Sequence, residues 1–156
     1  MHILTLLFVS TFGLVALAET SVPSDFKTDY CTNYPEGPKE DPSAWKHCCL
    51  KHDMYFWAGG SKQDRYDADL ELKNCIVDAG YPRQARIMYS AVRMGSYSPV
   101  KYPDRRWGNG WKNRAEFKAL SLEEIQSIKA ELDSGYKYIS DDLKSNFLSD
   151  LLKRKN

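Results

Sequence analysis

Four cysteines, two of them adjacent, limit what this chain can fold into. Cys48 and Cys49 are neighbours, and a disulfide between neighbouring residues strains the peptide that joins them. If the four cysteines form two disulfides, Cys48 and Cys49 must each reach either Cys31 or Cys75, and two connectivities are possible. The cysteine positions alone do not decide between them.

The N-terminus indicates export, and disulfides persist in the compartments that exported proteins reach. Residues 1–18 contain no Asp, Glu, Lys or Arg, and Ala16 and Ala18 stand in the A-x-A arrangement of a cleavage site. We therefore expect a signal peptide over 1–18, cleavage near Ala18, and secretion to the extracellular space or the periplasm. Because only the α-amino group and His2 supply positive charge, an uncleaved anchor is the alternative.

Length and charge exclude several classes of protein. The chain has 156 residues, which suits a single domain, and we place this domain at 19–156. It has 22 Lys and Arg against 21 Asp and Glu, a net charge of +1, so it lacks the basic surplus of a nucleic-acid-binding protein. With 13% aromatic residues it also differs from a charge-rich disordered tail. We expect no nucleic-acid partner.

Two segments have the start and stop signals of a helical hairpin. The first begins with a capping residue and a proline and contains no helix breaker until the Gly-Gly pair at 59–60, which predicts a helix over 42–57. The second begins at the candidate cap Ser61, with Asp64 three residues later, and ends near Gly80. The short connection favours antiparallel packing of the two helices.

The rest of the chain also predicts helices rather than strands. We expect a third helix over 83–94, irregular chain over 95–113, and a C-terminal helical extension over about 115–156. The extension contains a capping-box signature, Ser121 with Glu124, followed by apolar residues at helical spacing. The predicted fold is therefore all-α and disulfide-linked, with an antiparallel helix pair as its core and C-terminal helices.

The residues best suited to chemistry form the motif Cys-Cys-x-x-His-Asp at 48–53. His52 can act as a base near neutral pH, and Asp53 offers oxygen ligands that suit a hard cation such as calcium. Taken alone, a His-Asp pair on a helix is more often a surface pair. Cys48, Cys49 and His52 also have a spacing that zinc could use, but the chain has no Cys-x-x-Cys pair.

In a small exported protein with cysteines, this motif resembles the signature of secreted phospholipases A2. The resemblance covers residues 30–76. It implies that His52 is the general base, that Asp53 binds calcium, and that Asp69, six residues before a cysteine, orients the histidine. It also implies one of the two disulfide connectivities, with Cys31 bonded to Cys49 and Cys48 bonded to Cys75.

Two acidic residues compete for the role of the orienting carboxylate. On an antiparallel helix cross-linked through Cys75, Asp69 lies closer to His52 along the helix axis, whereas Asp67 fits the direction around the axis better. Helix geometry leaves both open, and the resemblance favours Asp69. A third interpretation treats the acidic residues of this helix as a solvated face.

The predicted calcium loop differs from that of the family, which is rich in glycine and cysteine. Residues 30–37 read YCTNYPEG, so Gly37 is the only glycine in this loop. Pro35 can make the loop follow a different path from that of the family. Phe56 stands where many family members have a tyrosine that supports the orienting carboxylate. By position, the candidate calcium ligands that the resemblance implies are the main-chain carbonyls of Tyr30, Thr32 and Tyr34.

Five basic residues lie between 101 and 114 beside two tryptophans, with one acid among them. This composition suits an anionic lipid interface, where indoles sit at the level of the headgroups and Lys or Arg pairs with phosphate. The alternative is a structural loop whose tryptophans cover the helix pair. The candidate interface residues are Arg105, Arg106, Trp107 and Trp111.

The resemblance therefore predicts a divergent, calcium-dependent phospholipase A2-type hydrolase that cleaves the sn-2 ester of glycerophospholipids. Its cofactor would be Ca²⁺, and its partner would be a phospholipid membrane surface that it binds peripherally. The alternative is a non-catalytic phospholipase A2-like protein that binds lipid or another protein.

Overall fold

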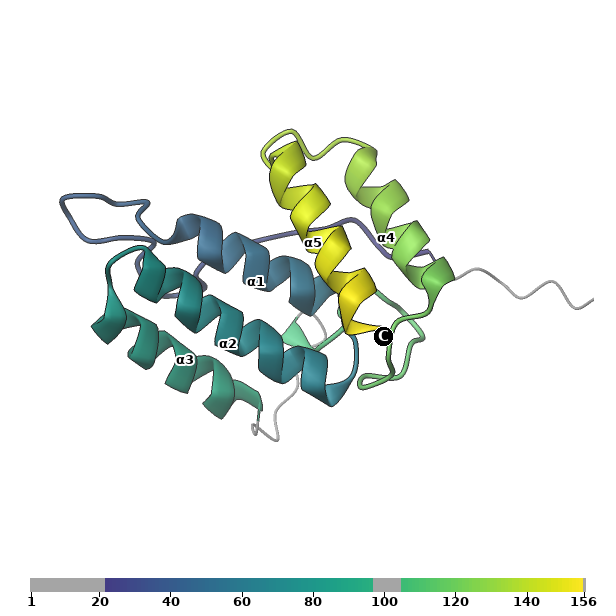
Figure 1. Cartoon of the computed structure of the whole chain (residues 1–156), viewed down its shortest axis with the longest axis horizontal. Helices are drawn as coiled ribbons and strands as arrows, with labels where there is room; N and C mark the ends of the chain where they lie inside the picture. The colour runs from purple at the N-terminus through teal and green to yellow at the C-terminus, as the bar shows by residue number, and fades with distance from the viewer. Residues whose placement is uncertain (1–21, 97–104, 156) are drawn as a thin grey trace, which may run out of the picture.

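The computed structural model describes residues 22–96 and 105–155, and these ranges contain helices and no strands (Figure 1). The all-α class is therefore confirmed, while the predicted signal peptide lies outside the described residues. None of the described helices is long and apolar enough to cross a membrane. In chain order the helices are α1 (Lys46–Ala58), α2 (Lys62–Asp78), α3 (Pro82–Ser96), α4 (Leu122–Asp133) and α5 (Asp141–Arg154).

The helices α1 and α2 lie side by side and run in opposite directions (Figure 1). The chain reverses at Gly59 and Gly60, whose φ angles of 76° and 146° favour glycine. Contacts between the helices also show antiparallel packing, because the residue number on α2 falls as the residue number on α1 rises. The pairs are Cys48 with Cys75, Lys51 with Glu71, and His52 with Asp69.

The first helix begins at Lys46 rather than at residue 42, which corrects the predicted start. The preceding residues form turns instead, in which the Ala44 amide donates to the carbonyl of Asp41 at 3.2 Å. The Trp45 amide donates to the carbonyl of Glu36 at 3.0 Å, so the preceding loop binds an amide that a longer helix would have used.

Two capping boxes form as the sequence predicts. The Ser61 hydroxyl accepts a hydrogen bond from the Asp64 amide, and the Asp64 carboxylate accepts one from the Ser61 amide. Ser121 and Glu124 make the same reciprocal pair at the start of α4. These local signals place the starts of both helices correctly because capping depends on residues only three positions apart.

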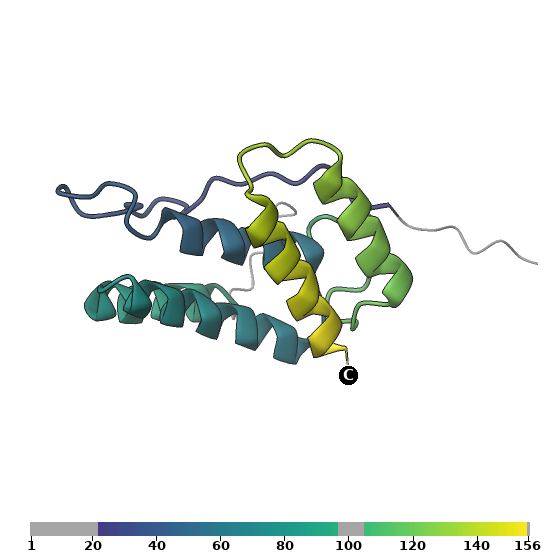
Figure 2. The ribbon, with the colours of Figure 1, turned by 45° about the horizontal axis from the view of Figure 1, so that its top comes forward.

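The C-terminal helix α5 packs across the C-terminal half of α1 (Figure 2). The rings of Tyr55 and Phe147 are both buried, with centroids 5.0 Å apart. The Tyr55 hydroxyl donates to Asp150 at 2.5 Å, and the Arg154 guanidinium lies 4.3 Å from the centre of the Tyr55 ring. The C-terminal extension therefore completes the hydrophobic core.

We expect Tyr55→Phe to lower the free energy of unfolding by about 1–2 kcal/mol, because it removes the donor to Asp150 but keeps the ring. Urea denaturation of both proteins measures the difference. Tyr138→Phe is the matched control, since Tyr138 is 50% exposed and its variant should stay within about 0.5 kcal/mol of the wild type. Equal losses in the two variants would contradict a role for the buried hydroxyl.

The two tryptophans of the predicted lipid interface lie in the core. Trp107 is 0% exposed and Trp111 is 1% exposed. Their indole N–H groups donate to the carbonyls of Gly60 at 2.8 Å and Ala58 at 2.7 Å, respectively. This burial corrects the expectation that both indoles face lipid headgroups and agrees with the alternative of a structural loop. The physical reason is that carbonyls at the end of α1 lack helical partners and need donors.

Candidate active site

His52 on α1 and Asp69 on α2 face each other and form a hydrogen bond. The Nε2 atom of His52 lies 2.8 Å from Oδ1 of Asp69, whose side chain is fully buried. Asp67, the competing carboxylate, instead accepts a hydrogen bond from Gln63 at 2.8 Å. Because Nε2 is engaged by Asp69, Nδ1 is the ring nitrogen that can accept a proton from water.

Arg93 holds the second oxygen of Asp69. Its Nη1 donates to Oδ2 at 2.7 Å, so α3 contributes to the site as well. Phe56 lacks the hydroxyl that a tyrosine would bring to this carboxylate, and its ring instead packs 4.7 Å from the imidazole of His52. Asp69 is therefore fixed by a histidine and an arginine. No spacing rule in the sequence pointed to Arg93.

Asp53 faces the loop that precedes α1. Its Oδ2 accepts a hydrogen bond from the Thr28 hydroxyl at 2.5 Å, and the Thr28 oxygen accepts one from the Tyr30 amide at 2.9 Å. Burial raises the pKa of Asp53 from 3.8 to about 6, although the Thr28 hydrogen bond and the nearby His52 oppose that rise. The carboxylate is half-buried, and its neighbours compensate its negative charge only partly. A bound cation would compensate the rest of that charge.

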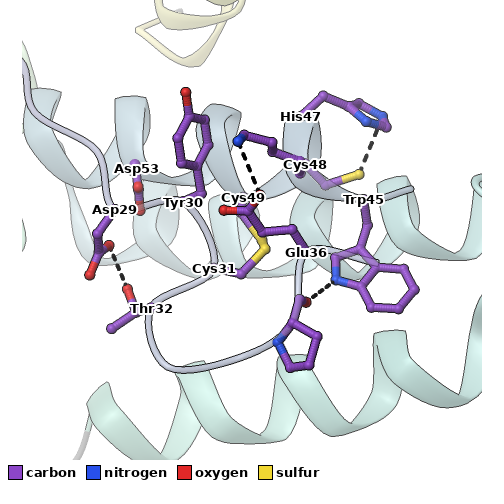
Figure 3. Close-up of a disulfide and its surroundings, with 12 residues drawn as sticks. Asp29, Tyr30, Cys31, Thr32, Glu36, Trp45, His47, Cys48, Cys49 and Asp53 are labelled. Carbon is purple, nitrogen blue, oxygen red and sulfur yellow. Dashed lines mark hydrogen bonds and ion pairs between the residues drawn. A yellow bond between two sulfur atoms is a disulfide. The ribbon is translucent and has the colours of Figure 1, made fainter. Parts of the chain in front are cut away.

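The loop beside Asp53 has an unusual backbone and is anchored to α1 (Figure 3). Tyr30, Thr32 and Asn33 have φ angles of 59°, 33° and 56°, a region that favours glycine. These three residues therefore adopt backbone conformations that glycine adopts most easily. A disulfide joins Cys31 to α1 four residues before Asp53, and therefore holds this backbone near the carboxylate.

Pro35 follows these residues and does not direct the loop away from the helix. The Trp45 indole donates to the carbonyl of Pro35 at 2.6 Å, and the ammonium of Lys46 lies 3.1 Å from Glu36 (Figure 3). Both contacts hold the loop against the start of α1.

All four cysteines are in disulfides, and none is free. A zinc site at Cys48, Cys49 and His52 would need thiolates, which disulfide sulfurs do not supply. The side chain of His47 lies close to the sulfurs of Cys48 and Cys75. Those two sulfurs are bonded to each other, so they do not supply thiolates for zinc either. The structure forms the connectivity that the resemblance implies, with Cys31 bonded to Cys49 and Cys48 bonded to Cys75.

A cavity of about 820 Å³ brings the candidate residues together. His52 and Asp53 line it, and α2 and α3 supply an apolar wall that includes Leu72, Met88 and Val92. A cavity of this size and lining suits part of a small organic or lipid molecule. Among the other predicted site residues, Tyr30, Thr32, Tyr34, Arg105 and Arg106 also line the cavity, whereas Asp69, Trp107 and Trp111 do not.

Comparison with known proteins finds no match. No family model, no curated protein and no solved structure matches this chain.

Proposed function

We propose that the protein is a calcium-dependent phospholipase A2-type hydrolase that cleaves the sn-2 ester of glycerophospholipids. One observation carries the proposal: His52, bonded to the buried Asp69, lies in the same cavity as Asp53 and an apolar wall. These groups supply a base, a carboxylate for a metal ion and room for an acyl chain, which together suit hydrolysis of a lipid ester.

In the proposed reaction, Nδ1 of His52 accepts a proton from water while the water oxygen attacks the ester carbonyl carbon. The hydrogen bond from Nε2 to Asp69 fixes the ring and stabilises the imidazolium that forms. His52 then returns the proton to the departing glycerol oxygen as the carbon–oxygen bond breaks. The products are a fatty acid and a lysophospholipid.

Asp53 and the neighbouring loop fit a calcium ion, the cofactor that we propose. A carboxylate and main-chain carbonyls are the hard oxygen donors that calcium prefers. The partly compensated charge of Asp53 supports a cation there, and the carbonyls of Tyr30, Thr32 and Tyr34 are the further candidates. When bound, calcium supplies positive charge that stabilises the developing carbonyl oxyanion.

The exposed apolar residues of α3 support contact with a phospholipid surface. Ile87 lines the cavity and is 47% exposed, while Met94, seven residues later on the same helical face, is 74% exposed. Arg105 lines the cavity and is exposed as well. We propose that this edge, rather than the buried tryptophans, meets the membrane.

We expect Met94→Glu to slow fatty-acid release from anionic vesicles about tenfold, because it removes an apolar contact and adds a charge that the surface repels. Release from a short-chain phospholipid below its micelle concentration should change less than twofold. Val77→Glu, at a 40% exposed position of α2, is the control. An equal slowing on vesicles and monomers would contradict a surface-binding role.

The products of the reaction test the proposed chemistry. The protein is incubated with calcium, ¹⁸O-labelled water and phospholipid that carries different acyl chains at sn-1 and sn-2, and the products are identified by mass spectrometry. We expect only the sn-2 fatty acid, with one oxygen from the labelled water, and an unlabelled lysophospholipid. Release of the sn-1 chain, or no release, would overturn the assignment.

A further inference from the structure

Arg65 is a buried cation in the wall of the cavity that holds His52 and Asp53. Arg65 lies near the start of α2 and is 9% exposed. Among the described residues, its Nε atom is buried and has no hydrogen-bond partner. Within the described ranges, the guanidinium also takes part in no ion pair. An arginine this buried is rare unless an anion accompanies it.

The surroundings of Arg65 compensate its charge only weakly. The guanidinium lies 4.8 Å from the centre of the Phe56 ring. Asp69 and Glu116 act on it electrostatically, but both oxygens of Asp69 are bonded to other residues, and Glu116 has a further interaction of its own. Burial consequently lowers the pKa of Arg65 below its ordinary value.

Two other cations near this cavity are engaged by the protein itself. Arg93 is bonded to Asp69, and Arg106 donates to the main-chain carbonyls of Trp111 and Arg114. Arg65 is therefore distinguished from both by its unpartnered Nε, and it has donors to offer a ligand inside the cavity.

We propose that Arg65 binds the phosphate of the molecule that enters this cavity. A guanidinium matches a phosphate oxyanion through paired N–H donors. The inference rests on the proposed function only in naming a phospholipid as the carrier of that phosphate. The ring of Phe56 contacts both the imidazole of His52 and the guanidinium of Arg65, and in a glycerophospholipid the sn-2 ester and the phosphate are attached to adjacent glycerol carbons.

Binding is measured without turnover, in His52→Gln and in excess chelator, so that neither hydrolysis nor calcium contributes. The probes are dihexanoylphosphatidylglycerol below its micelle concentration and dihexanoylglycerol, which has the same chains and no phosphate. We expect the phospholipid to bind at least about tenfold more tightly than dihexanoylglycerol, and adding Arg65→Met to remove most of that difference. Equal affinities for the two probes, or an unchanged difference in Arg65→Met, would overturn the proposal.

Two further variants separate ligand binding from other effects. Arg65→Lys keeps the charge but loses the paired donors, so it should retain only part of the phospholipid preference. Arg83→Met removes a charge from an exposed position of α3 and should change either affinity less than twofold. A loss in Arg83→Met equal to that in Arg65→Met would show that net charge, and not this site, sets the affinity.

Thermal unfolding distinguishes a binding arginine from a structural one. Arg65→Met removes a buried charge that its surroundings compensate only weakly, so we expect its Tm to equal or exceed that of the wild type. A structural arginine would instead give a lower Tm. If Arg65→Met does not fold, a structural role is indicated and the proposal is overturned.

The source of the phosphate is tested with inorganic phosphate as the probe. If inorganic phosphate raises the Tm in an Arg65-dependent manner while both lipids bind equally, free phosphate is the ligand and the phospholipid assignment is wrong. If the wild type hydrolyses phospholipid but Arg65→Met binds phospholipid as tightly as the wild type does, the phosphate-binding role of Arg65 is overturned and the proposed enzyme is not. Arg65-dependent phospholipid binding without any hydrolysis supports this site and overturns the proposed enzyme.

Discussion

His52→Gln is expected to slow fatty-acid release about a thousandfold, because glutamine cannot take a proton from water. The glutamine side chain still offers a polar group to Asp69, whose carboxylate also keeps its bond to Arg93. The fold should therefore persist, and near-ultraviolet circular dichroism should match that of the wild type. Initial rates on vesicles with saturating calcium measure the effect.

His47→Gln is the matched control for this variant. His47 lies on the same helix but is exposed, and it does not line the cavity of His52. Its variant should retain activity within about twofold of the wild type. If the two variants lose activity equally, or if His52→Gln keeps its rate, His52 is not the general base.

Asp53→Asn is expected to abolish the response to calcium. The amide keeps an oxygen for the Thr28 hydroxyl but loses the negative charge that the cation needs. Calcium should raise the Tm of the wild type by several degrees and leave that of Asp53→Asn unchanged. Hydrolysis by the variant should fall at least a hundredfold. Asp78→Asn, at an exposed position of α2, should behave as the wild type does.

The raised pKa of Asp53 makes the stability of the protein depend on pH with a definite sign. Because the folded pKa is about 6 and the ordinary value is 3.8, the folded state holds this proton more tightly than the unfolded state does. The stability that Asp53 contributes is present below pH 4 and is lost as pH rises through 6.

We therefore expect calcium-free Asp53→Asn to be more stable than the wild type at pH 8, on the order of 2 kcal/mol, with the gain vanishing near pH 4. Calcium must displace the proton, so its effect on the Tm should be small at pH 5 and complete above pH 7. A calcium effect that does not vary between pH 5 and 8 would contradict the assignment of Asp53 as a ligand.

The sequence predicts well those features that depend on nearby residues. The capping boxes at Ser61 and Ser121 need only residues three positions apart, and both helices start where these signals indicate. The predicted start of α1 is wrong because the amide of Trp45 donates to the loop carbonyl of Glu36. Helix start signals in the local sequence do not indicate this contact.

The parts of the site that the sequence missed depend on packing between distant segments. Arg93 reaches Asp69 from α3, and nothing in its local pattern distinguishes it from a solvated arginine. The burial of Trp107 and Trp111 follows from carbonyls more than 45 residues earlier in the chain. The unpartnered Nε of Arg65 can be recognised only from the described residues that pack around it.

A calcium-dependent hydrolase is tested most directly by fatty-acid release from mixed anionic and zwitterionic vesicles, measured with calcium and with excess chelator. We expect release that requires calcium and that is lost in His52→Gln. No release in calcium from protein with intact disulfides, or release that is equal in chelator, would contradict a calcium-dependent hydrolase built on His52 and Asp53.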